Sequence, residues 1–281
     1  MNNAIKIMSF AEYQNLPGVN FSSLKRIAES PLAYQWHLRQ PDEPTPAMLF
    51  GSAVHCAILE SDQFDQRYAV RPEGLDLRRT ADKQYWAELS AGKIALTITD
   101  AEKIAAMREG LYRNPEIRRL LEAPGTFEAT IQWTGPGGRL CKGRLDKYLD
   151  DGTIFGLKTT SKFDQRQFQS AAWQMFYHAQ WAWYYWGIGE LGLPRGEEMY
   201  EAVVQSSGPF DAAIYAVTGP IIEAGRVEYE GWLRTLTQCE KTNEWPGRYP
   251  DIVEFLPPKW AIGNDDYDIG ELDWGMENEQ Q

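Results

Sequence analysis

An aspartate and a lysine, Asp146 and Lys158, stand on opposite sides of a predicted tight turn. The turn, Asp-Asp-Gly at 150–152, separates two apolar-rich runs, and an Asp-Gly step in that setting is a strong signal for a β-hairpin. Side chains alternate between the two faces of a strand, so Gly156 and Lys158 are expected on the same face. The hairpin would therefore hold a carboxylate and an ammonium at one edge of a sheet.

This pairing suits chemistry on a phosphate. Hydrolysis of a phosphodiester at neutral pH requires an activated water and charge compensation, and one or two Mg²⁺ ions held by carboxylate oxygens supply both. Asp146 would then be a metal ligand, Lys158 would orient the water or stabilise developing charge, and the backbone carbonyl of Leu157 would complete the metal shell. A surface hairpin with an Asp–Lys ion pair is an equally good interpretation of this segment alone.

Polar residues on two predicted helices could complete such a site. His55 lies one helical turn after Gly51, so its imidazole would stand over bare backbone. Gln180 and Tyr184 are four residues apart and share a helical face, where they could hydrogen-bond a phosphate or a catalytic side chain. Each observation also has a structural interpretation: a lone histidine on an apolar helix is commonly a core residue, and the aromatic residues around Gln180 are typical of packing.

The elements that must position these residues follow from periodicity and from capping signals. Thr45-Pro46 opens one helix, Thr99-Asp100-Ala101-Glu102 is a capping box for another, and Asn114-Pro115 starts a short third. Pro31 is expected to stop the helix that Asn20 caps. Helices are thus predicted at 20–30, 46–60, 100–113, 164–172, 174–191 and 220–241, and strands at 126–134, 139–149, 153–159, 199–205 and 212–217.

This order of elements predicts one α/β or α+β domain with a central mixed sheet flanked by helices. We expect a single domain over residues 1–262, with a helical N-terminal part at about 20–122 and a sheet core at about 126–245. The remaining residues, 263–281, are acidic and polar, so a weakly ordered tail is expected there.

Composition limits the classes of function. The chain has 281 residues, a net charge of −12 and a pI of about 4.8, which argue against a protein that coats nucleic acid non-specifically. A local basic groove on an acidic body remains compatible with a DNA substrate. The three cysteines are widely spaced and suggest neither a zinc site nor a disulfide framework. No signal peptide and no apolar run of ~18 residues is evident, so we expect a cytoplasmic protein without a membrane span.

Four motifs in a fixed order carry a family resemblance. They are Gly51-Ser52-Ala53-Val54-His55, Gly143-Arg144-Leu145-Asp146, Gly156-Leu157-Lys158-Thr159-Thr160, and Gln180 followed four residues later by Tyr184. Together they resemble the PD-(D/E)XK nucleases with a restriction-endonuclease-like core, and within them the exodeoxyribonuclease VIII (RecE-like) branch found in prophages. The resemblance covers about residues 21–249. Each motif alone is weakly specific, whereas four in order are fairly specific.

The resemblance implies an activity and roles for individual residues. It implies an enzyme that degrades duplex DNA from its ends, 5′ to 3′, with Mg²⁺ or Mn²⁺, and leaves 3′ single strands for a RecT-like single-strand annealing protein. A ring-like homo-oligomer around DNA is implied as well. The implied metal ligands are His55 and Asp146, the implied catalytic lysine is Lys158, and Gln180 and Tyr184 are implied supporting residues. Glu128, on the preceding strand, could face the site or the solvent.

Position 156 departs from the family pattern, which has Asp or Glu where this chain has Gly156. Glycine offers no ligand atom, and inside a strand it costs about 0.5–1 kcal/mol relative to alanine. We therefore expect severely reduced activity. Gly156 could be a substitution introduced to trap the protein unreacted or the mark of a natural member that lost its chemistry. A second function class then stays open: an inert module that binds DNA ends or recruits a partner.

Phosphate contacts on an acidic body must come from local groups. Such contacts give salt-dependent binding without sequence readout, which suits an end-directed exonuclease, although any single basic residue is commonly just a solvated one. The candidate DNA-binding residues are Arg78, Arg79, Lys142, Arg144, Thr159, Thr160 and Lys162.

Overall fold

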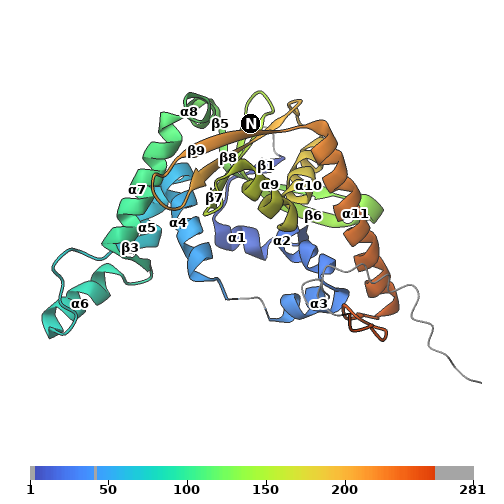
Figure 1. The fold of residues 1–281 in the computed structure, drawn as a ribbon, viewed down its shortest axis with the longest axis horizontal. Helices are drawn as coiled ribbons and strands as arrows, with labels where there is room; N and C mark the ends of the chain where they lie inside the picture. The colour runs from blue at the N-terminus through green and yellow to red at the C-terminus, as the bar shows by residue number, and fades with distance from the viewer. Residues whose placement is uncertain (1–3, 41–42, 257–281) are drawn as a thin grey trace, which may run out of the picture.

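The structure is a computed structural model that describes residues 4–40 and 43–256. It confirms the expected α/β class, because a mixed β-sheet lies between two layers of helices (Figure 1). The acidic tail expected at 263–281 lies outside the described residues. Within the described ranges, none of the helices is long and apolar enough to cross a bilayer.

The central sheet has the strand order β1-β5-β6-β7-β8-β9, and β2 also pairs with β6. The β7–β8 and β2–β6 pairs are parallel, and the other neighbours are antiparallel. A second, two-stranded parallel sheet is formed by β3 and β4. The strands are β1 (Ile5–Lys6), β2 (Val19–Asn20), β3 (Tyr68–Val70), β4 (Ile94–Leu96), β5 (Gly125–Thr134), β6 (Leu140–Leu149), β7 (Ile154–Thr160), β8 (Met199–Gln205) and β9 (Ala212–Val217).

One face of the sheet is covered by helices that precede it in the chain. Phe155 and Leu157 of β7 point into this layer and are fully buried. The helices on this side are α4 (Pro46–Leu59), α7 (Ile98–Arg113) and α8 (Pro115–Glu122). Two further helices, α5 (Phe64–Arg67) and α6 (Thr80–Leu89), lie beyond α4, and α6 projects away from the body (Figure 1).

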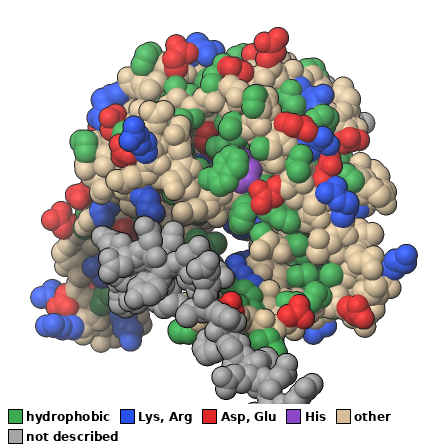
Figure 2. All heavy atoms as spheres, turned by 45° about the vertical axis from the view of Figure 1, so that its right-hand side comes forward, with side chains coloured by type: hydrophobic (Ala, Val, Ile, Leu, Met, Phe, Trp, Pro, Cys, Tyr) green, Lys and Arg blue, Asp and Glu red, His purple; other side chains and the backbone are tan. Residues whose placement is uncertain are grey.

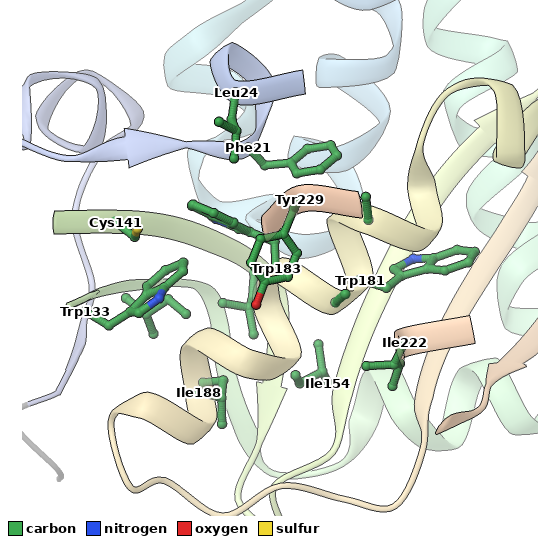
Figure 3. Packing of buried hydrophobic residues seen from close by; sticks show 14 of the residues in the cluster. Phe21, Leu24, Trp133, Cys141, Ile154, Trp181, Trp183, Ile188, Ile222 and Tyr229 are labelled. Carbon is green, nitrogen blue, oxygen red and sulfur yellow. The ribbon is translucent and has the colours of Figure 1, made fainter. Parts of the chain in front are cut away.

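The opposite face is covered mainly by α10, against which α11 packs. Trp183 of α10 is buried and makes edge contacts with Trp133, centroids 5.0 Å apart, and with Tyr229, centroids 5.4 Å apart (Figure 3). Much of the aromatic content of α10 is therefore core packing. The remaining helices are α1 (Phe10–Asn15), α2 (Phe21–Leu24), α3 (Pro31–Arg39), α9 (Gln165–Gln174), α10 (Tyr177–Glu190) and α11 (Gly219–Thr242).

The expected hairpin is present, with the turn at 150–152 joining β6 and β7. Two details of the helical part were wrong. The helix that ends at Arg113 begins earlier than expected, because Thr97 and Asp100 form the reciprocal capping box, rather than Thr99 and its partner. Pro31 was expected only to end a helical segment, but it is also the first residue of α3. Proline fits this position because the first N–H of a helix has no partner within the helix.

Candidate metal centre

The site opens where β6 loses its neighbour on one edge. β6 pairs with β7 at Lys147 and Tyr148, and with β2 at Cys141 and Lys142. Among the described strands, none pairs with residues 143–146 on that edge. Because the strands separate here, side chains from β6 and from the facing helices can meet in the gap. The two strand motifs of the sequence resemblance border this opening.

Three side chains that could hold a metal ion meet at the opening. His55 of α4, Glu128 of β5 and Asp146 of β6 each offer one ligand atom, and these atoms all lie within 4.8 Å of one another. His55 Nδ1 is 3.8 Å from Asp146 Oδ1. The expectation that His55 and Asp146 lie close together is met, and Glu128 faces the same site rather than the solvent.

Glu128 is held in an uncommon backbone conformation. Its φ is +48°, in the left-handed region that residues other than glycine rarely adopt. The pairs Phe127–Lys147 and Ala129–Leu145 flank it, so Glu128 stands opposite Asp146 between two paired positions of the ladder. Such strain costs of order 1–3 kcal/mol and is often found at functional sites. Here it places two carboxylates side by side.

Burial and like charge shape the protonation of the cluster. Burial, and after it the charge of Asp146, raises the pKa of Glu128 to about 7. Burial also lowers the pKa of His55, although Asp146 opposes that shift. A neutral imidazole and closely spaced carboxylates are the state that binds a divalent cation. The donor set of one nitrogen and several oxygens therefore fits Mn²⁺ or Mg²⁺.

Both ends of the Leu157 peptide unit face the centre. Its amide N–H donates to Asp146 Oδ2 at 2.7 Å, and its carbonyl oxygen accepts a hydrogen bond from the His55 ring. The backbone of Leu157, whose carbonyl is the ligand expected from the sequence, thus contacts two of the three cluster residues. Its side chain points the other way, into the core.

Lys158 lies beside the cluster on the opposite face of β7 from Leu157. Its side chain is 18% exposed, and its ammonium is 3.3 Å from Oε1 of Glu201 on β8 and 5.3 Å from the ring centre of Tyr177. Burial acts to lower the pKa of Lys158, but the charges of Glu201 and Asp146 outweigh burial and raise it. Lys158 is therefore held as a cation.

Glu201 is a site residue that sequence analysis missed. It stands opposite Gly156 in the parallel β7–β8 ladder, so the two residues share a face of the sheet with Lys158. Burial raises the pKa of Glu201, and Lys158 offsets part of that effect. The signal in the sequence was a lone carboxylate inside an otherwise apolar strand, 199–205, which is unusual for a strand in the interior of a sheet.

Gln180 and Tyr184 of α10 border the same opening. Gln180 Nε2 donates to the Tyr184 hydroxyl at 3.4 Å, which fits the expected helical pairing. Burial raises the pKa of Tyr184, and the charges of Asp146 and Lys158 both act on it. Gly143 lets the Tyr184 ring approach β6 closely, because a Cβ at that position would lie 3.1 Å from the ring.

Lys142 does not reach the surface, contrary to expectation. It is 3% exposed, and its ammonium donates to the carbonyl oxygens of Tyr13, Gln14 and Leu16 at 3.0, 3.0 and 2.7 Å. These carbonyls lie at the C-terminal end of α1, where a helix leaves its last carbonyls short of backbone donors. Lys142 therefore holds α1 against β6 and is not placed to bind phosphate.

Arg144 is also buried, against the expectation of a DNA contact. Its Nε donates to Glu128 Oε2 at 2.5 Å, and its Nη2 lies 3.6 Å from Glu60 Oε2. Arg67 in turn makes a two-pronged contact with Glu60, at 2.6 and 2.9 Å. Arg144 is thus a counter-ion that holds Glu128 in place.

The other predicted DNA-binding residues lie nearer the surface. Arg78 and Arg79 are exposed in the segment before α6, and Lys162 is exposed just after β7. Thr159 and Thr160 are half-buried at the end of β7, where the Thr160 hydroxyl accepts a hydrogen bond from the Lys162 amide at 3.0 Å. Lys162 and the two threonines follow directly on Lys158, whereas α6 projects away from the sheet (Figure 1).

The face of the molecule drawn in Figure 2 carries side chains of both charges. Figure 2 shows Lys and Arg side chains scattered among Asp and Glu, without one continuous basic surface. The acidic balance of the chain agrees with this pattern. Any phosphate contact on this face must therefore come from individual basic residues.

Comparison with known proteins agrees with this geometry. The model of a family described as a PDDEXK-like domain of unknown function (DUF3799) matches residues 20–254. The fold is similar to the crystal structure of a protein from Eubacterium rectale that is provisionally named an exonuclease, with 14% identity, a TM-score of 0.61, and coverage of 92% of this chain and 99% of that one. A weaker match, to the structure of SSO0001, has 16% identity, a TM-score of 0.30, and coverage of 86% and 90%.

No curated protein matches the sequence. The family match spans both the helical part and the sheet core, and it includes His55, Glu128, Asp146, Lys158 and Glu201. The sequence motifs predicted a hairpin with Asp146 and Lys158 at one edge, and the structure adds that β6 and β7 separate beyond Lys147. The chain belongs to the family of PDDEXK-like domains described as DUF3799.

Proposed function

We propose that this protein is a divalent-metal-dependent exodeoxyribonuclease that acts on the ends of linear duplex DNA. The observation that carries the proposal is the convergence of His55, Glu128 and Asp146, whose ligand atoms lie within 4.8 Å of one another. Lys158 stands next to them as a half-buried cation. A cation-binding cluster beside a fixed positive charge is what the hydrolysis of a phosphodiester requires.

Each residue of the site has a distinct role in the proposed reaction. His55, Glu128 and Asp146 would hold Mg²⁺ or Mn²⁺, which when bound supplies an acidified water and compensates phosphate charge. Lys158 lies where it can stabilise negative charge that develops on the phosphate. The Leu157 N–H fixes the Asp146 carboxylate, and Arg144 fixes Glu128, so the cluster is preorganised.

Lys162, Thr159 and Thr160 follow Lys158 along the chain and are the best-placed groups to hold the DNA backbone near the cluster. Arg78 and Arg79, at the root of the projecting α6, could contact DNA farther from the reacting phosphate. Contacts of this kind position the duplex without reading its sequence. Such binding suits an enzyme that starts at any end.

Four further properties of the proposed enzyme rest on the sequence resemblance to the RecE-like branch. They are 5′-to-3′ polarity, products with 3′ single strands, a single-strand annealing partner and a ring-like homo-oligomer around DNA. The order of the four motifs supports this branch, and two of these motifs supply His55 and Asp146 to the metal cluster.

Digestion of matched DNA substrates tests the proposal. Linear and covalently closed circular duplexes of one sequence are incubated with protein in Mg²⁺, in Mn²⁺ or in EDTA, and strands labelled at the 5′ end report polarity. We expect loss of the linear form only, and only with metal. Lys158→Met should reduce the rate about 10²–10³-fold, as removal of a charge-stabilising group does in other enzymes. Absence of metal-dependent degradation of linear DNA would contradict the proposal.

Gly156 favours a second candidate, an inert module that binds DNA ends or recruits a partner. The family pattern has a carboxylate at this position, and glycine supplies no ligand. This candidate predicts that duplex ends bind with a dissociation constant unaffected by Lys158→Met, and that neither metal allows digestion. A binding assay run beside the digestion separates the two functions.

A further inference from the structure

The position of the missing carboxylate is occupied by another one. Gly156 and Glu201 are partners in the parallel β7–β8 ladder. A Cβ placed on Gly156 would lie 2.7 Å from Oε1 and 2.8 Å from Cδ of Glu201. In an aspartate at position 156, the carboxylate oxygens would lie at a similar distance from that Cβ. The Glu201 carboxylate therefore reaches across from β8 into the space that such a side chain would fill.

Strand geometry explains why glycine and glutamate occur together. Neighbouring strands lie about 4.8 Å apart, so a carboxylate that starts on β8 needs the longer glutamate side chain to reach over β7. A Cβ at position 156 would force the Glu201 carboxylate to shift from this place. The glycine, which weakens a strand by itself, thus leaves room for its neighbour.

The surroundings of Glu201 are those of a functional group. The residue is 2% exposed, and a buried carboxylate is unfavourable unless it is paired. Its Oε2 accepts a hydrogen bond from Trp181 Nε1 at 2.5 Å. Its Oε1 lies 3.3 Å from Lys158 Nζ and accepts no hydrogen bond of normal geometry from the described residues. One oxygen of a buried carboxylate is thus left with an unused lone pair beside the catalytic lysine.

The charge of Asp146 acts on both Glu201 and Lys158, so Glu201 lies within the electrostatic reach of the metal cluster. Two nearby carboxylates repel each other unless a cation lies between them. Lys158 offsets part of this repulsion, and a divalent cation would offset more.

We propose that Glu201 supplies from β8 the acidic metal ligand that Gly156 lacks on β7, so that a divalent cation is held between Glu201 and Asp146. The proposal rests on the proposed metal-dependent function, and it removes the reason to expect an inert chain. In this arrangement the carboxylate enters the site from the neighbouring strand, while Lys158 keeps its usual place two residues after position 156.

Mn²⁺ binding to the purified full-length protein, measured by calorimetry and by the loss of the free-Mn²⁺ paramagnetic signal, tests the ligand directly. Glu201→Gln should weaken Mn²⁺ binding about 10- to 100-fold, at least the effect of losing a supporting group at a metal site. Glu197→Gln, an exposed residue just before β8, is the matched control and should leave the affinity unchanged. Thermal unfolding of each variant establishes that it is folded.

A carboxylate exchange keeps the test decisive if Glu201→Gln alone is unstable. Gly156→Asp together with Glu201→Ala returns the acidic group to β7 beside Lys158. This double variant should bind Mn²⁺ within a few-fold of the starting protein. Gly156→Asp alone should not bind better than the starting protein, because two carboxylates would compete for one space.

Mn²⁺ affinity that is the same in Glu201→Gln as in the starting protein would overturn the proposal, even if DNA digestion is normal. A double variant that folds but does not bind Mn²⁺ would also count against it. DNA digestion is scored separately. If the protein binds Mn²⁺ through Glu201 but does not digest DNA, the proposed function is contradicted, while the proposal that Glu201 is a metal ligand stands.

Discussion

Asp146 Oδ2 accepts a hydrogen bond from the Leu157 amide at 2.7 Å, across the point where β6 and β7 separate. The side chain therefore replaces part of the ladder that the two strands no longer form. The same carboxylate presents its other oxygen, Oδ1, to His55. The hydrogen bond to the backbone and the contact with His55 thus use different oxygens of one side chain.

Substitutions of Asp146 should separate these two roles. Asp146→Asn keeps an oxygen that can accept from the Leu157 N–H but removes the charge, so we expect loss of Mn²⁺ binding with little change in stability. Asp146→Ala leaves the N–H without a partner, which costs about 1–3 kcal/mol. Urea unfolding and Mn²⁺ titration of both variants measure the difference. Equal stability of the two variants would contradict the bridging role.

Glu128 should make the metal-free protein less stable as pH rises. Its pKa is raised from 4.5 to about 7, so the folded state favours the protonated form. The stability this gives is present below pH 4.5 and is lost as pH rises through 7, up to about 3 kcal/mol. Glu128→Gln should therefore raise the melting temperature at pH 8 in EDTA and change it less at pH 5.

Added Mn²⁺ should reverse this dependence, because a bound cation favours the ionised carboxylate. Melting curves of the starting protein at pH 5 and pH 8, with EDTA and with Mn²⁺, measure the reversal. A melting temperature in EDTA that does not fall between pH 5 and pH 8 would show that Glu128 is not held protonated.

Lys147 illustrates a buried lysine with a structural role. It is fully buried, and its ammonium donates to the carbonyl oxygens of Leu120, Leu121 and Ala123 at 2.9, 2.7 and 2.6 Å. Lys147→Met would leave these carbonyls at the end of α8 unpaired, at a cost of roughly 3 kcal/mol. Lys103→Met, at an exposed position on α7, should cost under about 0.5 kcal/mol. Denaturant midpoints compare the two variants.

Local patterns were enough to predict the main strands and long helices. The strands at 199–205 and 212–217 match β8 and β9 in full, and the Asp-Gly turn formed as expected. The capping box was misplaced because both candidates, at Thr97 and Thr99, satisfy the local pattern, and only tertiary packing decides between them. The short helix α1 was missed, and its last carbonyls are held by the side chain of Lys142, which is distant in the sequence.

The site was predicted in part for a related reason. His55, Asp146 and Lys158 were found from motifs, and the structure brings His55 and Asp146 together. The local pattern marked Glu201 only as an unusual carboxylate in an apolar strand. Its relation to Gly156 exists only once two helices have returned the chain to form the parallel β7–β8 pair. The burial of Arg144 likewise depends on Glu128 and Glu60, which come from other elements.

The salt dependence of DNA binding distinguishes surface cations from buried ones. Removing one cation that binds a phosphate of duplex DNA reduces the slope of log K against log salt by roughly 0.9. Lys162→Met removes an exposed cation next to the site, so the slope should fall by about that amount. Lys142→Met removes a cation already bound to three carbonyls, so the slope should stay the same while stability drops. Fluorescence anisotropy with a labelled duplex, at several salt concentrations, measures both slopes. A lower slope for Lys142→Met would mean that this lysine leaves α1 to contact DNA.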